Sequence, residues 1–444
     1  MKYDKDFLQS LNDTIIKKAL ARGVDSVESY ISISEGINIT TKGPFIEALN
    51  SNPTEFEIKV AIGKKIGIAS VTSLEERRIE ETIKKAIKIA KIIPEDKDFI
   101  KFAEPIKRAS NDGIISDEIL QLSSDDLVKM VIEATTESKN ADSRIISSTG
   151  IANKSYSIFS VANSNGINDA SEGVGYYIAV AVNAKADVGT SSGYEFLVSR
   201  KKVEDVTGLG KKAAKRALEF VSPEKLEGAV KYPIVFENLV FSDLLSVMMG
   251  YTLSARHVMY KESYYTDKLG EMVANKNFTL IDDGQLPEGL STTKVDREGV
   301  PRQKTTVIDR GKLVSFLTDS YSAYKMNLPL TGNSAGNAVS PTNFRIEGGT
   351  KGFQGLIESF DKCIVIKTNL LGVGHSNSQT GDFSILATNP LLWQKGELKP
   401  LRPVTLAGNF YKILHNVLEV GNDYRLLSDG YLPSIAIEGI TISS

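Results

Sequence analysis

The chain has 444 residues, of which 41% are hydrophobic and 24% charged, as expected for a globular protein of two domains. Its formal net charge of −2 offers no broad basic surface for nucleic acid, and its one cysteine, Cys363, excludes an internal disulfide. The acidic N-terminus lacks a signal-peptide core, and no apolar stretch approaches the roughly 20 residues that span a bilayer. We therefore expect a cytoplasmic protein with no nucleic-acid or membrane partner.

The first half of the chain alternates helical and strand patterns. Apolar residues three and four positions apart predict helices over residues 7–20, 73–93, 124–138 and 203–220. Alternating patterns predict strands over 27–33, 56–61, 66–71, 156–161, 175–184 and 194–198. Residues 94–123 are polar and irregular, which indicates a connection. This order predicts an α+β domain over residues 1–222, in which helices cover one side of a sheet.

The second half carries fewer helical patterns. One helix is predicted over residues 239–250, and short β runs follow at 279–282, 304–308, 314–317, 363–367, 383–387 and 435–442. Gly, Asn and Pro separate these runs, which is typical of a mostly β sandwich or barrel. We expect this second domain to span residues 229–444.

The histidines do not form a recognisable metal-binding pattern. His257, His375 and His415 are so far apart in sequence that no two share one turn of a helix, and no His-Glu-x-x-His sequence occurs. A zinc site needs three or four His, Cys, Asp or Glu ligands that converge. The sequence therefore predicts no metal ligand and no catalytic residue in this chain.

One glycine-rich segment has two interpretations. In Gly374-His-Ser-Asn-Ser-Gln-Thr-Gly-Asp-Phe-Ser384, polar side chains surround glycines that permit close approach of another backbone. The segment fits either the wall of a peptide groove or a turn held by an aspartate side chain. The candidate peptide-binding residues are Gly374, Asn377, Thr380, Gly381, Asp382 and Ser384. No base stands beside Ser384 in sequence, so it is not predicted to be a nucleophile.

Several further motifs follow one another in a fixed order. They are Lys231-Tyr-Pro-Ile-Val235, Gly270-Glu271, Asp282-Asp-Gly284, Asp296-Arg-Glu-Gly-Val-Pro301, Thr331-Gly-Asn333, the Gly374–Ser384 segment and Ala407-Gly-Asn409. Their order and spacing resemble the TldD/TldE (PmbA) family, whose active complexes are zinc peptidases. The resemblance is closest from about residue 229 to the end, and looser in the first half.

The resemblance also implies which type of subunit this is. In the peptidase-type subunit a His-Glu-x-x-x-His helix lies upstream of the Gly-Glu segment. Counting back from Gly270, the corresponding positions here hold Ser246, Val247 and Tyr251. Valine cannot act as a general base, and none of the three replaces an imidazole on zinc. The chain thus resembles the TldE/PmbA-type subunit without the zinc motif.

This resemblance implies a function for the complex. The chain would pair as a heterodimer with a TldD-type subunit that holds the zinc, and would carry no cofactor itself. Whether it forms a homodimer when alone stays open. The pair would degrade or mature small unfolded peptides, held in extended form. Two alternatives stay open: a stand-alone modulator of the type named for DNA gyrase, and an autonomous hydrolase that uses the Gly374–Ser384 loop.

Overall fold

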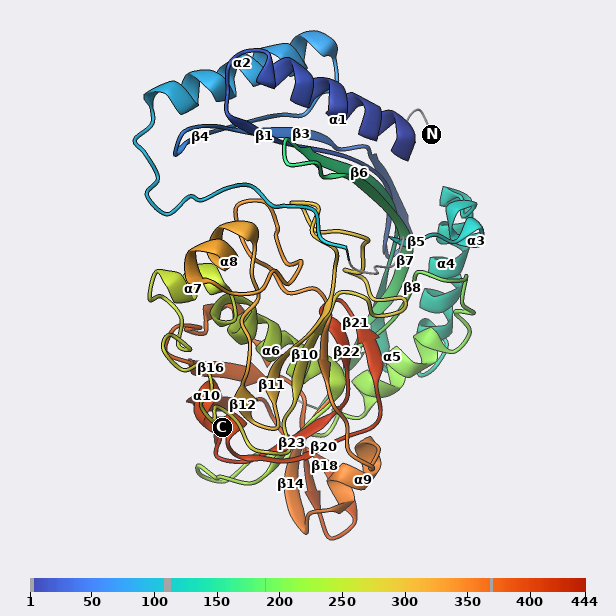
Figure 1. Cartoon of the computed structure of the whole chain (residues 1–444). Helices are drawn as coiled ribbons and strands as arrows, with labels where there is room; N and C mark the ends of the chain where they lie inside the picture. Colours follow the sequence, from blue (N-terminus) through green and yellow to red (C-terminus); the bar gives the residue numbers. More distant parts are fainter. Residues whose placement is uncertain (1–3, 108–112, 188, 368–369) are drawn as a thin grey trace.

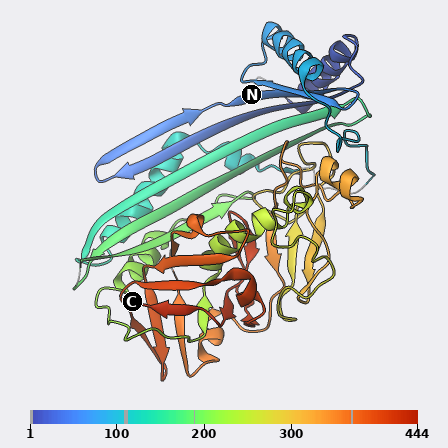
Figure 2. The ribbon, with the colours of Figure 1, turned by 90° about the vertical axis from the view of Figure 1, so that its left-hand side faces the viewer.

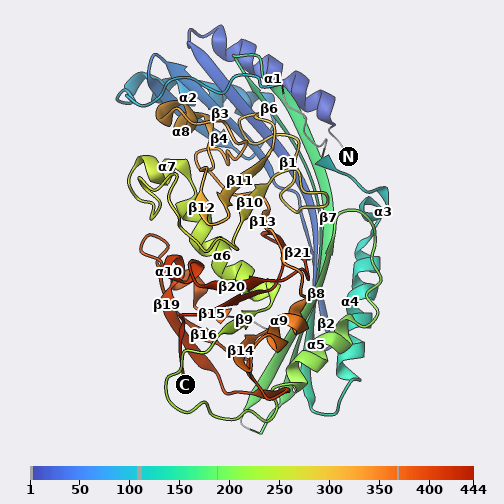
Figure 3. The same ribbon diagram turned by 60° about the horizontal axis from the view of Figure 1, so that its bottom comes forward.

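Long antiparallel strands form an eight-stranded sheet in the N-terminal half (Figure 1). The computed structural model describes residues 4–107, 113–187, 189–367 and 370–444. The strands are β1 (Ser26–Lys42), β2 (Phe45–Ser51), β3 (Thr54–Ile62), β4 (Lys65–Val71), β5 (Gly113–Ile114), β6 (Ile145–Asn163), β7 (Asn168–Lys185) and β8 (Thr190–Ser199). Their order is β4-β3-β1-β6-β7-β5, with β2 beside β1 and β8 beside β7. The long strands form one curved surface with a convex and a concave face (Figures 1 and 3).

Helices cover the convex face of this sheet (Figures 1 and 3). They are α1 (Lys5–Leu20), α2 (Glu76–Ile92), α3 (Asp117–Leu120), α4 (Ser124–Lys139) and α5 (Leu209–Leu218). The apolar stripes of α1, α2 and α4 pack with buried strand residues into one hydrophobic core. The predicted α+β arrangement with helices on one side of the sheet is confirmed. Helix α5 is shorter than predicted, because the chain turns before it at Gly208, whose φ is +84°.

Three sheets build the C-terminal half. The first six-stranded sheet has the order β12-β11-β10-β13-β22-β21, the second β18-β17-β14-β9-β23-β20, and a four-stranded sheet β15-β16-β19-β24. Their strands are β9 (Ile234–Phe236), β10 (Leu280–Asp283), β11 (Lys304–Asp309), β12 (Lys312–Leu313), β13 (Phe344–Ile346), β14 (Lys362–Ile366), β15 (Leu370–Leu371), β16 (Asp382–Ala387), β17 (Pro390–Gln394), β18 (Glu397–Pro400), β19 (Val404–Asn409), β20 (Val417–Val420), β21 (Arg425–Leu427), β22 (Gly430–Leu432), β23 (Ile435–Ile437) and β24 (Thr441–Ser443). Over the described residues these sheets pack in layers and do not close into a barrel.

One buried helix lies among these sheets. Helix α6 (Asn238–Thr252) is apolar around most of its circumference, and Phe241, Leu244, Leu245 and Met248 are fully buried. A helix that is apolar on all sides is stable only where other elements surround it. The remaining helices are shorter: α7 (Ala255–Met259), α8 (Ser320–Met326), α9 (Phe353–Glu358), the 3₁₀ turn η1 (Val373–His375) and α10 (Phe410–Leu414).

The concave face of the N-terminal sheet faces the C-terminal half, and its long strands extend across it (Figures 2 and 3). Ala179 of β7 and Phe196 of β8 are buried in the same hydrophobic core as α6. No helix within the described ranges is long and apolar enough to cross a membrane.

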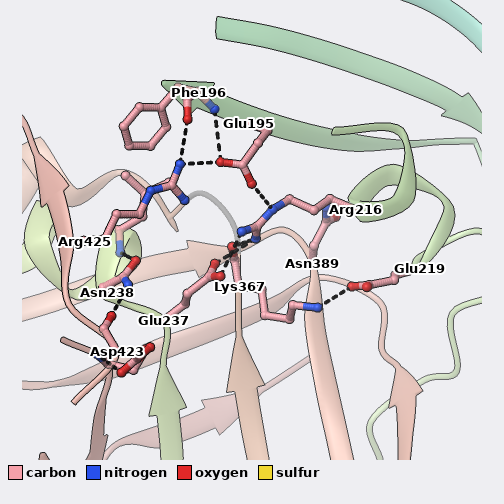
Figure 4. A network of polar contacts seen from close by, with 12 residues as sticks. Glu195, Phe196, Arg216, Glu219, Glu237, Asn238, Lys367, Asn389, Asp423 and Arg425 are labelled. Atoms are coloured by element: carbon pink, nitrogen blue, oxygen red, sulfur yellow. Dashed lines mark hydrogen bonds and ion pairs between the residues drawn. The ribbon is translucent and has the colours of Figure 1, made fainter. Parts of the chain in front are cut away.

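A buried ion-pair network joins the two halves beside α6 (Figure 4). Arg216 of α5 donates from its two terminal nitrogens to both carboxylate oxygens of Glu237, at 2.7 and 2.8 Å. Its Nε donates to Glu195 of β8 at 3.1 Å, and Arg425 of β21 also pairs with Glu195. Burial alone would raise the pKa of Glu195, but the two arginines hold it below its ordinary value. Because Glu237 is the N-cap of α6, this network ties the start of α6 to the N-terminal sheet.

Candidate functional site

Ser246, Val247 and Tyr251, at which the family resemblance implies a zinc motif in the peptidase-type subunit, lie on the last two turns of α6 and have other contacts. Val247 packs against the hydrophobic core. Tyr251 stacks on His257, with ring centroids 3.6 Å apart, and its hydroxyl donates to Glu262 Oε2 at 3.3 Å. Ser246 Oγ is buried and has no hydrogen-bond partner within the described residues. The contacts of Val247 and Tyr251 are packing and stacking contacts within the protein.

The side chains around α6 do not fit a zinc ion. Throughout the described ranges, no group of three or more His, Cys, Asp or Glu residues is placed to hold a metal. A hydroxyl, a methyl-bearing side chain and a phenol do not provide the imidazole, thiolate or carboxylate donors that zinc prefers. We therefore derive no metal-assisted step from this chain.

The Gly374–Ser384 segment begins in η1, ends in β16 and folds largely through its own side chains. Asn377 Oδ1 accepts from the backbone nitrogens of Gln379 and Thr380, at 3.0 and 3.1 Å. Thr380 Oγ1 donates to Asp382 Oδ2 at 2.9 Å, and Asn409 Nδ2 donates to Asp382 Oδ1 at 2.8 Å. These bonds, first from Asn409 and then from Thr380, hold the pKa of Asp382 below its ordinary value.

The glycines of this segment differ in their surroundings. Gly381 has a φ of +85°, and a Cβ there would lie 2.4 Å from Tyr411 Cδ2, so the turn requires glycine. A Cβ at Gly374 would meet no atom within 4 Å. Ser384 lies on the exposed face of β16. Of the two interpretations of this segment, the turn built on Asp382 describes its internal contacts, and a role in peptide binding stays a prediction.

The segment nevertheless packs against the end of α6. Gln379 Nε2 donates to the hydroxyl of Tyr251 at 3.2 Å, and the hydroxyl of Tyr411 donates to the backbone oxygen of Ser378. Two regions that the sequence analysis singled out separately, the zinc-motif positions and the glycine-rich segment, are therefore neighbours. The histidines are not brought together with them as a set: His257 lies against Tyr251, whereas His375 and His415 are exposed.

The Asp296–Pro301 motif has a structural role between the two halves. Asp296 accepts from the backbone nitrogens of Glu298 and Val300, both at 2.9 Å, and so fixes a tight loop. The next side chain, Arg297, pairs with Glu55 at 3.0 Å and lies over the ring of Tyr30 at 3.9 Å. The motif thus docks the C-terminal half onto the N-terminal sheet.

Three adjoining cavities run from the concave face of the sheet to α6. The first, of about 230 Å³, is lined by small polar residues and glycines of β6 and β7. The second, of about 240 Å³, is lined by Tyr177, Tyr194 and Phe196, and shares Tyr177, Val198 and Leu290 with the first. The third, of about 320 Å³, contains Ser246, Gly250, Ser340 and Asp429, and shares Ser428 with the second. Because neighbouring cavities share lining residues, we refer to the three together as the groove, and its third cavity contains Ser246 of α6.

Asp429 lines the third cavity, and Asp243 lies one helical turn before Ser246. The pKa of Asp243 is raised to about 6, chiefly by burial and further by Asp429. Neither carboxylate has an ion-pair partner within the described residues. Sequence analysis missed this groove, because its walls come from β6, β7, β8, α6 and the segments around residues 290, 340 and 428, which are far apart in the chain.

Comparison with known proteins identifies the family. Residues 229–444 match the family model described as the PmbA/TldA metallopeptidase C-terminal domain, and residues 117–220 match that of its central domain. The chain belongs to the PmbA/TldD family. It is 27% identical to "Metalloprotease PmbA" of Escherichia coli O157:H7 over 432 residues, which cover 94% of this chain and 92% of that protein.

Two solved structures of the family share this fold. A Thermotoga maritima protein described as a proposed modulator of a DNA gyrase superposes with a TM-score of 0.90 at 25% identity, covering 98% of this chain and 100% of the other. TldE from Thermococcus kodakarensis superposes with a TM-score of 0.88 at 23% identity, again over 98% and 100% of the two chains. The latter likeness shows the fold alone.

Proposed function

We propose that this chain is the TldE/PmbA-type subunit of a cytoplasmic peptidase complex and does not itself hold the catalytic zinc. The observation that supports this proposal is that Val247 packs against the core and Tyr251 stacks on His257, at the positions where the resemblance implies a zinc motif. In this proposal the zinc belongs to a TldD-type partner, and this chain supplies part of the chamber that holds small unfolded peptides.

An exposed apolar edge supports association with another subunit. All residues of β2 are exposed, and β2 pairs with β1 along one of its edges. Phe45, Ile46 and Leu49 on this strand are 76%, 47% and 57% exposed. An unpaired edge strand with apolar side chains is a ready surface for pairing with another chain. We therefore place part of the subunit interface at β2.

The function is tested by co-expression of this chain with a TldD-type subunit. We expect one complex on size-exclusion chromatography, hydrolysis of unfolded peptides by the complex, and no stoichiometric zinc in this chain when it is purified alone. Peptide hydrolysis by the isolated chain, or one tightly held zinc per chain after mild chelation, would refute the proposal. A change in DNA gyrase supercoiling by the isolated chain, without complex formation, would favour the modulator alternative.

Variants of β2 test the interface. Replacing Phe45 and Leu49 with glutamate places charge on the exposed edge and is expected to prevent complex formation without unfolding the chain. Ile92, which is 75% exposed at the end of α2, provides a matched control as Ile92→Glu. Complex formation by the double variant as efficient as by the control would show that β2 is not in the interface.

A further inference from the structure

A buried arginine without a carboxylate partner lies at the first cavity of the groove. Arg200 directly follows β8 and is 6% exposed. Its Nε donates to the backbone oxygen of Val174 at 3.1 Å, and its Nη1 donates to those of Gly289 and Thr292, at 2.6 and 3.0 Å. Among the described residues no aspartate or glutamate pairs with it, and burial lowers the pKa of Arg200 to about 10. A buried charge without a counter-charge is costly unless a ligand neutralises it.

The remaining nitrogen of this guanidinium lies beside a glycine of the cavity wall. Nη2 of Arg200 has no hydrogen bond within the described residues, and it lies 2.3 Å from the position that a Cβ at Gly173 would occupy. Gly173 lines the same cavity, so the nitrogen lies against its wall where a larger residue would exclude it. Nε and Nη1 thus donate to backbone oxygens of the chain, while Nη2 is available to donate to a ligand.

The cavity offers further donors and no acidic side chain. Ser157 pairs with Gly173 and Ser155 with Gly175 across β6 and β7, so both hydroxyls lie on the same face of the sheet as the cavity. No aspartate or glutamate is among its lining residues. A guanidinium with adjacent hydroxyls is suited to a carboxylate, which it binds through charge-assisted hydrogen bonds.

The adjoining cavity suits a large apolar side chain. The ring centroids of Tyr177 and Phe196 are 5.8 Å apart, and those of Tyr194 and Phe196 are 5.9 Å apart. Tyr177, Val198 and Leu290 line both cavities, so a carboxylate in the first and a side chain in the second can belong to one residue. Because the groove continues to the cavity beside Ser246, its length fits a peptide better than a free amino acid.

We propose that Arg200 binds the α-carboxylate of a peptide whose large apolar C-terminal side chain occupies the aromatic cavity. The preceding residues of the peptide then extend along the groove toward α6. This inference rests on the proposed function in that the occupant is a peptide, and it adds a substrate class: peptides with a free carboxylate after an aromatic or large aliphatic residue. It makes Arg200 a binding residue of this chain, independent of the zinc in the partner.

The test is direct binding of labelled peptides to the purified chain. The probe is alanyl-alanyl-alanyl-phenylalanine with a fluorophore at its N-terminus, measured by fluorescence anisotropy. We expect the C-terminal amide, and the acid that ends in glycine, to bind about tenfold or more weakly than the phenylalanine acid. Arg200→Gln is expected to lower the affinity for the acid to that for the amide. The control Lys201→Gln, at the neighbouring position, is expected to leave the affinity for the acid unchanged. Equal binding of acid and amide would overturn the proposal.

A second variant covers loss of folding in Arg200→Gln, since Arg200 also binds backbone oxygens. Ser157 is exposed, so Ser157→Asp retains the fold and places a competing carboxylate in the cavity. We expect this variant to lower the affinity for the acid about tenfold and to leave the affinity for the amide unchanged. Equal effects on both affinities would overturn the proposal. An amide peptide with an internal glutamate that binds as tightly as the acid would overturn the assignment to the C-terminus.

This experiment separates the inference from the proposed function. It requires neither the partner subunit nor zinc. Failure of the two subunits to associate would refute the proposed complex and leave the carboxylate site standing. Loss of the distinction between acid and amide would refute the carboxylate site and leave the complex standing.

Discussion

The ion pairs of Arg216 join residues that are far apart in the sequence, and they lead to a prediction about the free energy of unfolding. Arg216→Met removes a bidentate contact to Glu237, a bond to Glu195 at 3.1 Å and a bond to the backbone oxygen of Lys367 at 2.8 Å. Breaking a buried ion pair costs about 3–5 kcal/mol, because the remaining charge stays buried. The side chains of Arg216 and Glu237 are each 13% exposed, so we expect the lower end, about 3 kcal/mol.

The double variant is expected to recover much of this loss. Removing both Arg216 and Glu237 leaves Glu195 paired with Arg425, which keeps the site neutral. A double-mutant cycle with methionine at both positions should therefore give a coupling free energy of about 2 kcal/mol or more in urea unfolding. The control is the exposed pair Arg77 and Glu81, for which a much smaller coupling is expected, because solvent screens both charges. A coupling as small as that of the control would refute the reasoning.

Two further predictions concern the groove and the loop beside it. Gly381→Val should lower the free energy of unfolding by about 1–3 kcal/mol from backbone strain alone, with more from the contact with Tyr411, whereas Gly374→Ala should stay near wild type. Equal urea midpoints for the two variants would contradict this. The raised pKa of Asp243 favours its protonated form in the folded chain, so its contribution to stability is present below pH 4 and is lost as pH rises through about 6. Asp243→Asn should flatten this fall in urea unfolding, and Asp429→Asn should reduce it; an unchanged slope in Asp243→Asn would show that another group is responsible.

Local patterns in the sequence predicted the longer helices of the first half, α6 and the longer strands. They missed short strands such as β13 and β20, and the strand predicted over 314–317 is wrong, because only an isolated bridge, at Leu317, lies within that range. The three- and four-residue spacing in α1 and α4 reports which side of each helix is buried, and that spacing needs no distant partner to be read. The long alternating strand β1 was predicted over only part of its length, because its far end pairs with the exposed hairpin strand β2 and has fewer buried residues. The mismatch of Ser246, Val247 and Tyr251 with a His-Glu-x-x-x-His pattern can likewise be read from the sequence alone.

The glycine-rich segment shows where local reasoning reached its limit. The sequence allowed either a peptide groove or a turn held by Asp382, since both need glycine beside polar groups. Tyr411 of α10 packs against Gly381, and Asn409 of β19 donates to Asp382. Their approach depends on strand pairing between β16 and β19, which no local pattern in the segment encodes.

What the sequence by itself determined is therefore the principal helices, the longer strands, the α+β class and the absence of a His-Glu-x-x-x-His motif, since each follows from neighbouring residues. Only the tertiary structure decided that Arg200 is buried without a carboxylate partner among the described residues, and that Tyr177, Phe196 and Ser246 line adjoining cavities. The physical reason is that burial and charge pairing depend on residues that approach one another only when the sheet curves over the C-terminal half. A net charge of −2 describes the whole chain, but not which arginine lacks a counter-charge.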